Sequence, residues 1–165
     1  MCGLVGCVGS EEAAPVILEG LEKLEYRGYD STGISILSKE RIIGQKAMGQ
    51  LSILREKLEK EPIYGSTGVG HTRWATHGRP LERNAHPQYD CEQEISVAHN
   101  GIIENYLELQ EELREKGHIF VSETDTEVIP HLIEEYYEGD LVLAVQKAIS
   151  KLDGAFALAV IAAKE

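Results

Sequence analysis

The sequence predicts a single domain of mixed α+β class, and three observations support this prediction. The chain has 165 residues, which is the size of one ordinary domain and is long enough to bury a hydrophobic core. Short apolar runs typical of strands alternate with stretches in which apolar residues recur at helical spacing. The sequence shows no repeat, low-complexity tract or linker that would divide it.

In the first half, apolar runs predict four strands, and helical periodicity predicts two helices. Pro15 fits the first turn of the first helix, in which Ile17, Leu21 and Leu24 share one face. Pro62 ends the second helix. In chain order, the expected elements are a buried strand over 3–9, the helix containing Pro15, a hairpin of strands over 32–37 and 42–48, a helix over 50–61 and a strand over 68–75.

The second half is predicted to contain a long loop, three strands and three helices. Loops as long as the one over 76–94 are usually functional or disordered. Thr124 and Glu127 have the spacing of a capping box, with Asp125 in the first helical turn. Pro130 predicts that this helix kinks or that its regular part begins later. The expected elements are strands over 95–99, 118–122 and 155–162, the last one buried, a helix from Ile102 to Leu113 closed by Gly117, a helix after Thr124 and a helix over 140–152.

The charge balance excludes several classes of partner. The chain has 16 basic and 28 acidic residues, for a formal net charge of −12. Nucleic acids and anionic membranes are bound by basic surfaces, so we expect neither as a partner. Glu108, Glu111, Glu112 and Glu115 lie on one predicted helix, where we expect a solvated surface.

The cysteines and histidines predict a reduced protein without a metal. Cys2, Cys7 and Cys91 are odd in number and include no CxxC pair, which argues against both a disulfide framework and a zinc site of familiar spacing. The six histidines are scattered and form no paired motif, so no metal and no cofactor is expected. The sequence shows no signal-peptide pattern and no apolar run as long as a membrane span, so the expected location is cytoplasmic.

Cys2, directly after the initiator methionine, has two interpretations. It is either a small buried residue at the start of a strand or a nucleophile. If Met1 is removed, Cys2 carries a thiol and a free α-amine on one residue. The amine titrates near ~8 and the thiol near ~8.5, so the amine can accept the thiol proton near neutral pH.

Four further residues supply the other groups that attack on an amide would need. Asn100 and Gly101 offer either two donors for an oxyanion or a tight turn, and sequence alone favours the turn. Arg73 suits a carboxylate and Asp125 suits an ammonium, so together they would hold an α-amino acid. Taken singly, each is typical of a structural ion pair or cap. Trp74 fits either a core position or the wall of a site.

Six segments together resemble the glutaminase domain of glutamine–fructose-6-phosphate aminotransferases, also called glucosamine-6-phosphate synthases: MCG, LEYRGYDSTGISIL, HTRWATHGRP, NAHP, HNGIIENY and SETDTEVI. The similarity covers the whole chain. MCG alone indicates only the wider class of N-terminal-nucleophile amidotransferases, and LEYRGYDS and HTRWATHG narrow it to the aminosugar branch. The resemblance implies a four-layer α/β/β/α sandwich of N-terminal-nucleophile hydrolase type. It also implies that residues 1–165 form an incomplete glutaminase domain that lacks the sugar-phosphate isomerase domains.

The resemblance implies a role for each candidate residue. Cys2 would attack the side-chain amide of L-glutamine, form a γ-glutamyl thioester and release ammonia. Asn100 and Gly101 would form the oxyanion hole, and Arg73 and Asp125 would grip the α-carboxylate and the α-amine.

Four residues are implied to surround the substrate. Thr76 and His77 would line the glutamine pocket, and Trp74 would shield the ammonia path. Arg27 begins a loop beside the pocket. In the full-length enzyme the ammonia would convert fructose-6-phosphate to glucosamine-6-phosphate, and a homodimer is left open because in the family it depends largely on the isomerase part.

Two alternative functions remain at this point. The first is an inactive fragment that binds glutamine. A retained Met1 would also make the chain inactive, because the α-amine of Cys2 would then be part of a peptide bond. The second is a thiol amidase acting on another amide. Arg73 and Asp125 argue against the second, because a substrate without free α-amino and α-carboxylate groups would leave both charges unpaired.

Overall fold

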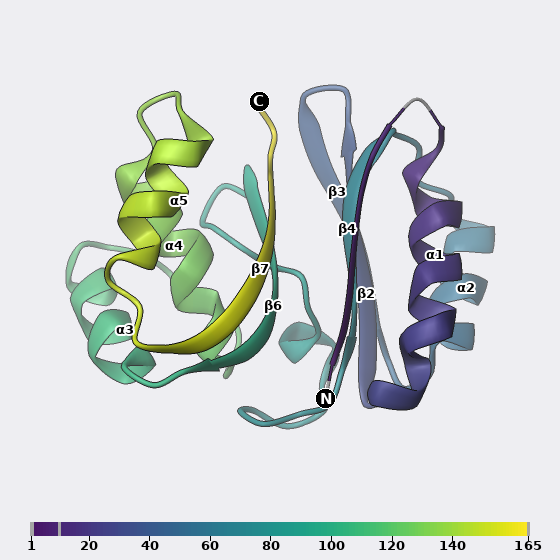
Figure 1. Ribbon diagram of the computed structural model, residues 1–165, viewed down its shortest axis with the longest axis horizontal. Coiled ribbons are helices and arrows are strands. Elements are labelled where there is room, and N and C mark those ends of the chain that lie inside the picture. The colour runs from purple at the N-terminus through teal and green to yellow at the C-terminus, as the bar shows by residue number, and fades with distance from the viewer. Residues whose placement is uncertain (1, 10, 165) are drawn as a thin grey trace.

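The computed structural model describes residues 2–9 and 11–164 as two antiparallel sheets packed face to face, each covered on its outer side by helices. Figure 1 shows these layers edge-on, with helices at the left and right of the paired sheets. This is the four-layer α/β/β/α sandwich that the family resemblance implied.

The first sheet has four strands in the order β1-β4-β2-β3, and all neighbouring strands are antiparallel. Two amphipathic helices bury their apolar faces, including Ile17, Leu21 and Leu54, against this sheet. The elements are β1 (Gly3–Val8), α1 (Ala13–Leu24), β2 (Ser31–Ser38), β3 (Arg41–Met48), α2 (Leu51–Lys60) and β4 (Thr67–Arg73).

The second sheet has three strands in the order β5-β6-β7, and three helices pack on its outer face. Ile129 and Ile133 of one helix and Leu113 of another are fully or nearly fully buried there. The elements are β5 (Gln88–Tyr89), β6 (Ile95–Ile103), α3 (Tyr106–Glu115), α4 (Val128–Tyr136), α5 (Leu141–Ile149) and β7 (Gly154–Ala162).

A small apolar cluster joins the inner faces of the two sheets. Ile42 and Val69 of the first sheet pack with Ala98 and Ile161 of the second. Small side chains such as Ala98 let the sheets approach closely, and strands β1 and β4 contact β6 and β7. The chain therefore brings the start of β1 next to the far end of β6, which lies about a hundred residues later.

Most of the predicted elements are confirmed, and the differences have local causes. The hairpin, the helix over 50–61 and the helix after Asp140 form as expected, the last with the Asp140 side chain accepting a hydrogen bond from the Leu143 amide at 2.9 Å. The buried character predicted for the first and last strands is wrong for most of their residues, because β1 and β7 are edge strands.

The strand predicted over 95–99 continues to Ile103, because β7 pairs with β6 along its whole length. The predicted helix therefore starts at Tyr106 rather than Ile102. It also means that Asn100 and Gly101 lie within a strand, so the tight-turn interpretation of this pair is wrong.

The strand predicted over 118–122 does not form. The backbone amides of Val121 and Ser122 instead donate to the Glu127 carboxylate at 2.8 and 2.7 Å, which gives them side-chain partners in place of a neighbouring strand. The Glu127 carboxylate thus binds these two amides and not the amide of Thr124, and the Thr124 side chain caps no helix. The predicted capping box is therefore wrong.

Pro130 is accommodated in the first turn of α4. One turn of 3₁₀ helix over Asp125–Glu127 precedes this helix, whose regular part begins at Val128. A proline in the first turn lacks only an amide that would have no intrahelical partner. The later helix start was one of the two outcomes expected.

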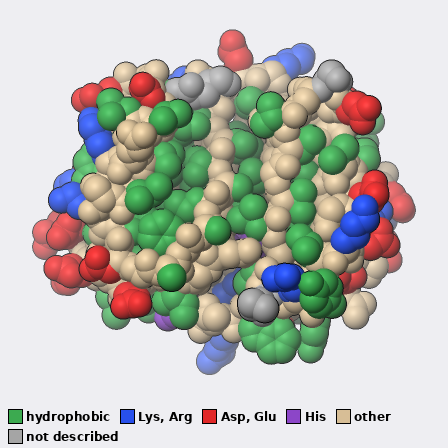
Figure 2. Space-filling model, viewed as in Figure 1, with side chains coloured by type: hydrophobic (Ala, Val, Ile, Leu, Met, Phe, Trp, Pro, Cys, Tyr) green, Lys and Arg blue, Asp and Glu red, His purple; other side chains and the backbone are tan. Residues whose placement is uncertain are grey.

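The molecular surface agrees with the expected charge pattern. Figure 2 shows acidic side chains gathered at the left and right sides, over the helical layers. Glu108, Glu111, Glu112 and Glu115 are all exposed. Within residues 2–9 and 11–164, none of the helices combines the length and apolar character that crossing a membrane would require.

Candidate active site

Cys2 lies just before β1 and beside the end of β4. Its sulfur accepts a hydrogen bond from the Trp74 amide at 3.2 Å, and its thiol faces the Trp74 carbonyl at 3.6 Å. These two contacts hold the sulfur against the backbone of Trp74, directly after β4. The Cys2 side chain is half-buried, so it is both positioned and accessible.

The loop after α1 is clamped against the same strand end. The Asp30 side chain accepts from the Ala75 amide at 2.7 Å, and the Asp30 amide donates to the Arg73 carbonyl at 3.0 Å. Gly28 is required for this close approach, since a Cβ there would lie 2.7 Å from the Arg73 carbonyl carbon. This loop places Arg27 on the rim of a cavity in front of Cys2.

Arg73 ends β4 with its guanidinium buried. It donates to the carbonyls of the following loop, at Gly78 with 3.3 Å, at Arg79 with 3.4 Å and closely at His77. An arginine has five N–H donors, so two remain without a partner among the described residues. Burial lowers the pKa of Arg73, and nearby Cys2, Asp30 and Asp125 favour its charged form.

Asp125 faces Arg73 across the cavity and is nearly as buried. One of its oxygens accepts from the Ile103 amide at 2.8 Å, and the other lies 3.9 Å from His77 Nδ1. The second oxygen can therefore accept from a bound ammonium. A cation-binding and an anion-binding group thus stand in one cavity, which is the pattern that an α-amino acid requires.

Asn100 is held by a histidine that the sequence did not single out. His71 Nε2 lies 2.8 Å from Asn100 Oδ1, and burial lowers the pKa of His71 to about 4. The neutral ring therefore donates its Nε2–H to Oδ1 and leaves the amide nitrogen on the side of Cys2, whose carbonyl lies 3.4 Å away. Next to it, Gly101 has φ +130°, and a Cβ there would lie 2.2 Å from the Ala155 carbonyl oxygen.

Three stacked imidazoles lie behind this pair. The rings of His71 and His86 are 4.4 Å apart, and those of His86 and His99 are 6.2 Å apart. Burial lowers the pKa of all three. Because His86 is neutral, its Nδ1–H donates to the His99 carbonyl and its Nε2 accepts from Thr126, whose hydroxyl oxygen accepts from His99 Nδ1–H at 2.7 Å.

These residues enclose one cavity of about 680 Å³ between the ends of the two sheets. It is lined by eight of the nine site residues predicted from the sequence, namely Cys2, Arg27, Arg73, Trp74, Thr76, Asn100, Gly101 and Asp125. His77 is not among the lining residues; its Nδ1 lies 3.9 Å from Asp125 Oδ1, and its ring lies 5.3 Å from that of Tyr106. Trp74 stands at the rim, 47% exposed, with Tyr29 packed edge-to-face against it.

Sequence reasoning missed several residues of this cavity. His86, His99 and Thr126 line it, and so do Glu104 and Phe156. No local pattern marks these residues, because they meet only when β6 and β7 pair and the loop over 76–94 folds across them. His86 stands within the NAHP segment and His99 directly precedes Asn100, which was the one available signal.

The sequence from residue 71 to 165 matches the family model of the glutamine amidotransferase domain. The chain belongs to this family. Glutamine–fructose-6-phosphate aminotransferase from Clostridium tetani is 56% identical over 165 residues, and the same enzyme from Aquifex aeolicus is 54% identical over 165 residues. Both alignments cover 100% of the chain, but only 27% and 28% of the relatives. The amidotransferase chain thus spans about a quarter of their length.

Solved structures of amidotransferases share the fold. Glutamine phosphoribosylpyrophosphate amidotransferase from B. subtilis superposes with a TM-score of 0.85 at 30% identity, covering 98% of this chain and 35% of that one. The family model and the shared fold identify the chain as a glutamine amidotransferase domain with an N-terminal-nucleophile fold.

Proposed function

We propose that Cys2 is the nucleophile with which this amidotransferase domain hydrolyses L-glutamine to glutamate and ammonia. The observation that carries the proposal is that Cys2, Arg73, Asn100 and Asp125 line a single cavity. Removal of Met1 is a condition of this mechanism, and Met1 lies outside the described residues. Residues 1–165 would then form part or all of a glutaminase domain.

The reaction follows from these groups. The Cys2 α-amine takes the thiol proton, and the sulfur attacks the γ-amide carbon of glutamine. Negative charge develops on the amide oxygen, where the Asn100 side-chain N–H and the Gly101 backbone N–H would stabilise it. The C–N bond breaks as the protonated α-amine donates its proton to the leaving nitrogen, so that ammonia departs and a γ-glutamyl thioester remains on Cys2. Water then hydrolyses the thioester and restores the thiol.

Substrate selection would rest on the two buried charges. The two unpartnered N–H donors of Arg73 suit the α-carboxylate, and the outer oxygen of Asp125 suits the α-ammonium. His77 supports Asp125 from behind, and Thr76 and Arg27 complete the wall. An amide that lacked the free α-groups would leave both charges desolvated, which is costly.

The relatives are much longer than this chain, so we propose a partner for the released ammonia. The name of the relatives indicates fructose-6-phosphate as the acceptor, and this sugar phosphate would be bound by an isomerase part outside residues 1–165. The exposed aromatic residues Tyr26, Tyr29 and Trp74 near the cavity would contact this part and shield ammonia from water. Because the Cys2 thiol must stay reduced, we assign the domain to the cytoplasm.

Labelling with 6-diazo-5-oxo-L-norleucine, a glutamine-like electrophile, tests the site. We expect the intact mass to show loss of Met1 and one adduct, mapped to Cys2 and blocked by excess L-glutamine. Cys7 and Cys91 serve as internal controls and should stay unlabelled. If labelling fails on protein whose N-terminal residue is shown to be Cys2, or maps to another cysteine, the proposal is wrong.

A further inference from the structure

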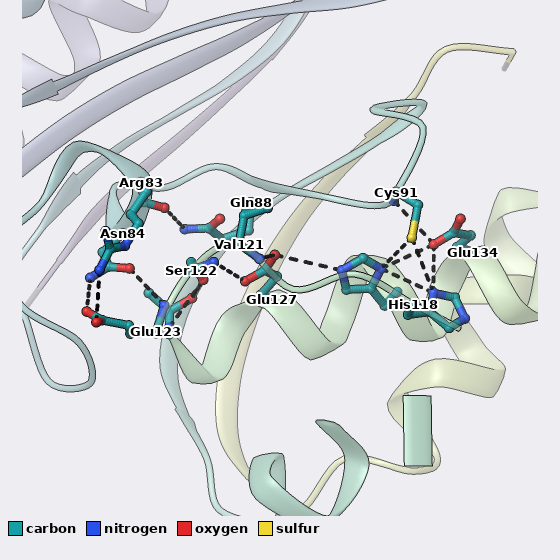
Figure 3. Close-up of polar contacts among 12 residues, drawn as sticks. Arg83, Asn84, Gln88, Cys91, His118, Val121, Ser122, Glu123, Glu127 and Glu134 are labelled. Atoms are coloured by element: carbon teal, nitrogen blue, oxygen red, sulfur yellow. Dashed lines mark hydrogen bonds and ion pairs between the residues drawn. The ribbon is translucent and has the colours of Figure 1, made fainter. Parts of the chain in front are cut away.

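A second cluster of reactive side chains lies away from the cavity, on the outer side of the second sheet. It consists of Cys91, His118, His131 and Glu134, and their potential ligand atoms all lie within 4.8 Å of one another. Figure 3 shows Cys91, His118 and Glu134 pointing toward one common point. Only His131 and Glu134 are neighbours on a helix, so the spacing in the sequence gave no sign of the cluster.

The distances within the cluster are those of a tetrahedral metal site. His118 Nδ1 and His131 Nδ1 are 3.2 Å apart and lie 3.0 and 3.2 Å from Glu134 Oε2. Cys91 Sγ lies 3.7 and 3.6 Å from the same two nitrogens. Zinc holds nitrogen, oxygen and sulfur at about 2.0–2.3 Å, so donors of a tetrahedral zinc site are about 3.3–3.6 Å apart. These five separations agree within a few tenths of an ångström, and all potential ligand atoms of the cluster lie within 4.8 Å of one another.

Both imidazoles also have a carboxylate on their outer side. His118 Nε2 lies 3.4 Å from Glu135 Oε1, and His131 Nε2 lies 3.8 Å from Glu127 Oε1. Glu135 is within hydrogen-bond distance of His118 Nε2, so it can hold the proton there and leave the lone pair of Nδ1 facing the cluster, as in carboxylate–histidine–zinc arrangements. Glu127 lies near His131 Nε2 at an ion-pair distance that is longer than a hydrogen bond. Glu135 is itself fixed by Lys116 Nζ at 2.5 Å.

Four electron-pair donors therefore meet at one point. We propose that Cys91, His118, His131 and Glu134 bind one Zn²⁺ ion. A thiolate, two imidazoles and a carboxylate form a donor set that zinc accepts, whereas Mg²⁺ and Ca²⁺ prefer sites made entirely of oxygen. Because four protein groups complete a tetrahedron, the site is structural and leaves no coordination position for a substrate.

The ion would join three segments that are far apart in the sequence. Cys91 belongs to the turn between β5 and β6, His118 to the segment after α3, and the other two ligands to α4. The segment after α3 makes no strand, so a metal bond at His118 would anchor it. An ion that binds only the folded state adds to the free energy of unfolding in proportion to the logarithm of its concentration.

Zinc titration of the full chain tests the proposal, in a Cys2→Ala background that removes the active-site thiol. We expect one equivalent of Zn²⁺ by calorimetry and by metal analysis, a rise in Tm with zinc, and thiolate-to-metal absorption when Co²⁺ replaces zinc. Adding Cys91→Ser should abolish the Co²⁺ absorption and weaken Zn²⁺ affinity at least tenfold. The matched control, adding Cys7→Ser, should change neither.

A second variant tests the outer carboxylates. Glu135→Gln should weaken Zn²⁺ affinity about 10-fold or more while retaining the Co²⁺–thiolate absorption, because losing a carboxylate behind a ligand histidine typically costs 10–100-fold. The proposal is overturned if the Cys2→Ala protein binds no zinc at micromolar concentration. It is equally overturned if the protein with both Cys2→Ala and Cys91→Ser binds one equivalent as tightly as its parent. Cys91 is exposed, so serine there should leave the fold intact.

Discussion

Cys2 and Cys91 are both free thiols near the surface, yet their surroundings differ in kind. The Cys2 sulfur accepts a backbone N–H from Trp74 and lies near the charged Arg73, so its neighbours offer positive potential. The Cys91 sulfur instead stands beside two imidazole nitrogens, with a carboxylate completing the cluster. The first environment places a single sulfur at the wall of a cavity, and the second places a sulfur among other potential metal ligands.

The histidines around the two thiols differ in the same way. Behind Cys2, His71 and His86 stack in a buried column where no carboxylate of the described residues accepts from them, and burial lowers the pKa of both. Beside Cys91, His118 and His131 each have a carboxylate on the outer nitrogen. The same side-chain type therefore fixes an amide in one region and offers ligand nitrogens in the other.

The largest expected effect separates the two thiols directly. Cys2→Ala should lower glutamate release at least about 10³-fold, because removing a nucleophile removes the covalent route. Glutamine binding, measured by calorimetry, should remain within a few-fold. Cys7→Ala and Cys91→Ala should each leave the rate within a few-fold at 25 °C. If the Cys2→Ala protein still hydrolysed glutamine, Cys2 would not be the nucleophile.

Removal of the oxyanion donor should have the next largest effect. Asn100→Ala is expected to lower kcat about 10²–10³-fold, since losing one such donor typically costs that much. His71 is a positioning residue, so His71→Leu should lower kcat less, about tenfold, and leave KM nearly unchanged. His71→Gln, which keeps an N–H donor for Asn100 Oδ1, should recover part of the loss. Equal kcat in His71→Leu and wild type would refute the positioning role.

The sequence predicted the fold well where local patterns decide it. The hairpin of β2 and β3 and the apolar faces of α1 and α2 follow from alternation and helical spacing, which neighbouring residues determine. The prediction over 118–122 was wrong because the Glu127 side chain, six and five residues further along the chain, accepts from the amides of Val121 and Ser122. The pattern of apolar residues gives no information about such a contact between a side chain and the backbone.

Only those residues of the candidate site that are chemically distinctive by themselves could be predicted from the sequence. An N-terminal cysteine and an Asn-Gly pair are chemically distinctive, and the family resemblance assembled them. The ring of His71 and the cluster around Cys91 have no such mark, because strand pairing and helix packing bring together residues from distant segments. His118 and His131, for example, meet only through the packing of α3 on α4.

Substrate binding should respond to the charge in front of Cys2. Arg73→Lys should raise KM for glutamine about 10–100-fold with a smaller change in kcat, because lysine keeps the charge but loses the planar pair of donors. Part of this effect would come from the loop over 77–79, whose carbonyls Arg73 holds. Lys147→Arg, an exchange on α5 at a residue that does not line the cavity, is the control for a general effect. An unchanged KM would exclude Arg73 from carboxylate binding.

The smallest expected effect concerns the decrease in stability at acidic pH. The pKa of His71 falls to about 4 in the folded chain, from the model-compound value of 6.5, because burial penalises its charged form. Between these values the unfolded chain binds more protons, so the free energy of unfolding decreases as pH falls from 6.5 toward 4.

For His71 alone this decrease amounts to about 1 kcal/mol between pH 7 and pH 5.5. Urea unfolding of His71→Gln, whose side chain does not titrate, should lack this share of the pH dependence. Chelator in every sample removes any contribution of bound metal at Cys91, so the buried column is measured by itself. If the free energy of unfolding of His71→Gln had the full wild-type pH dependence, His71 would not be the group whose protonation opposes folding. The proposed difference between the buried histidines behind Cys2 and those beside Cys91 would then be wrong.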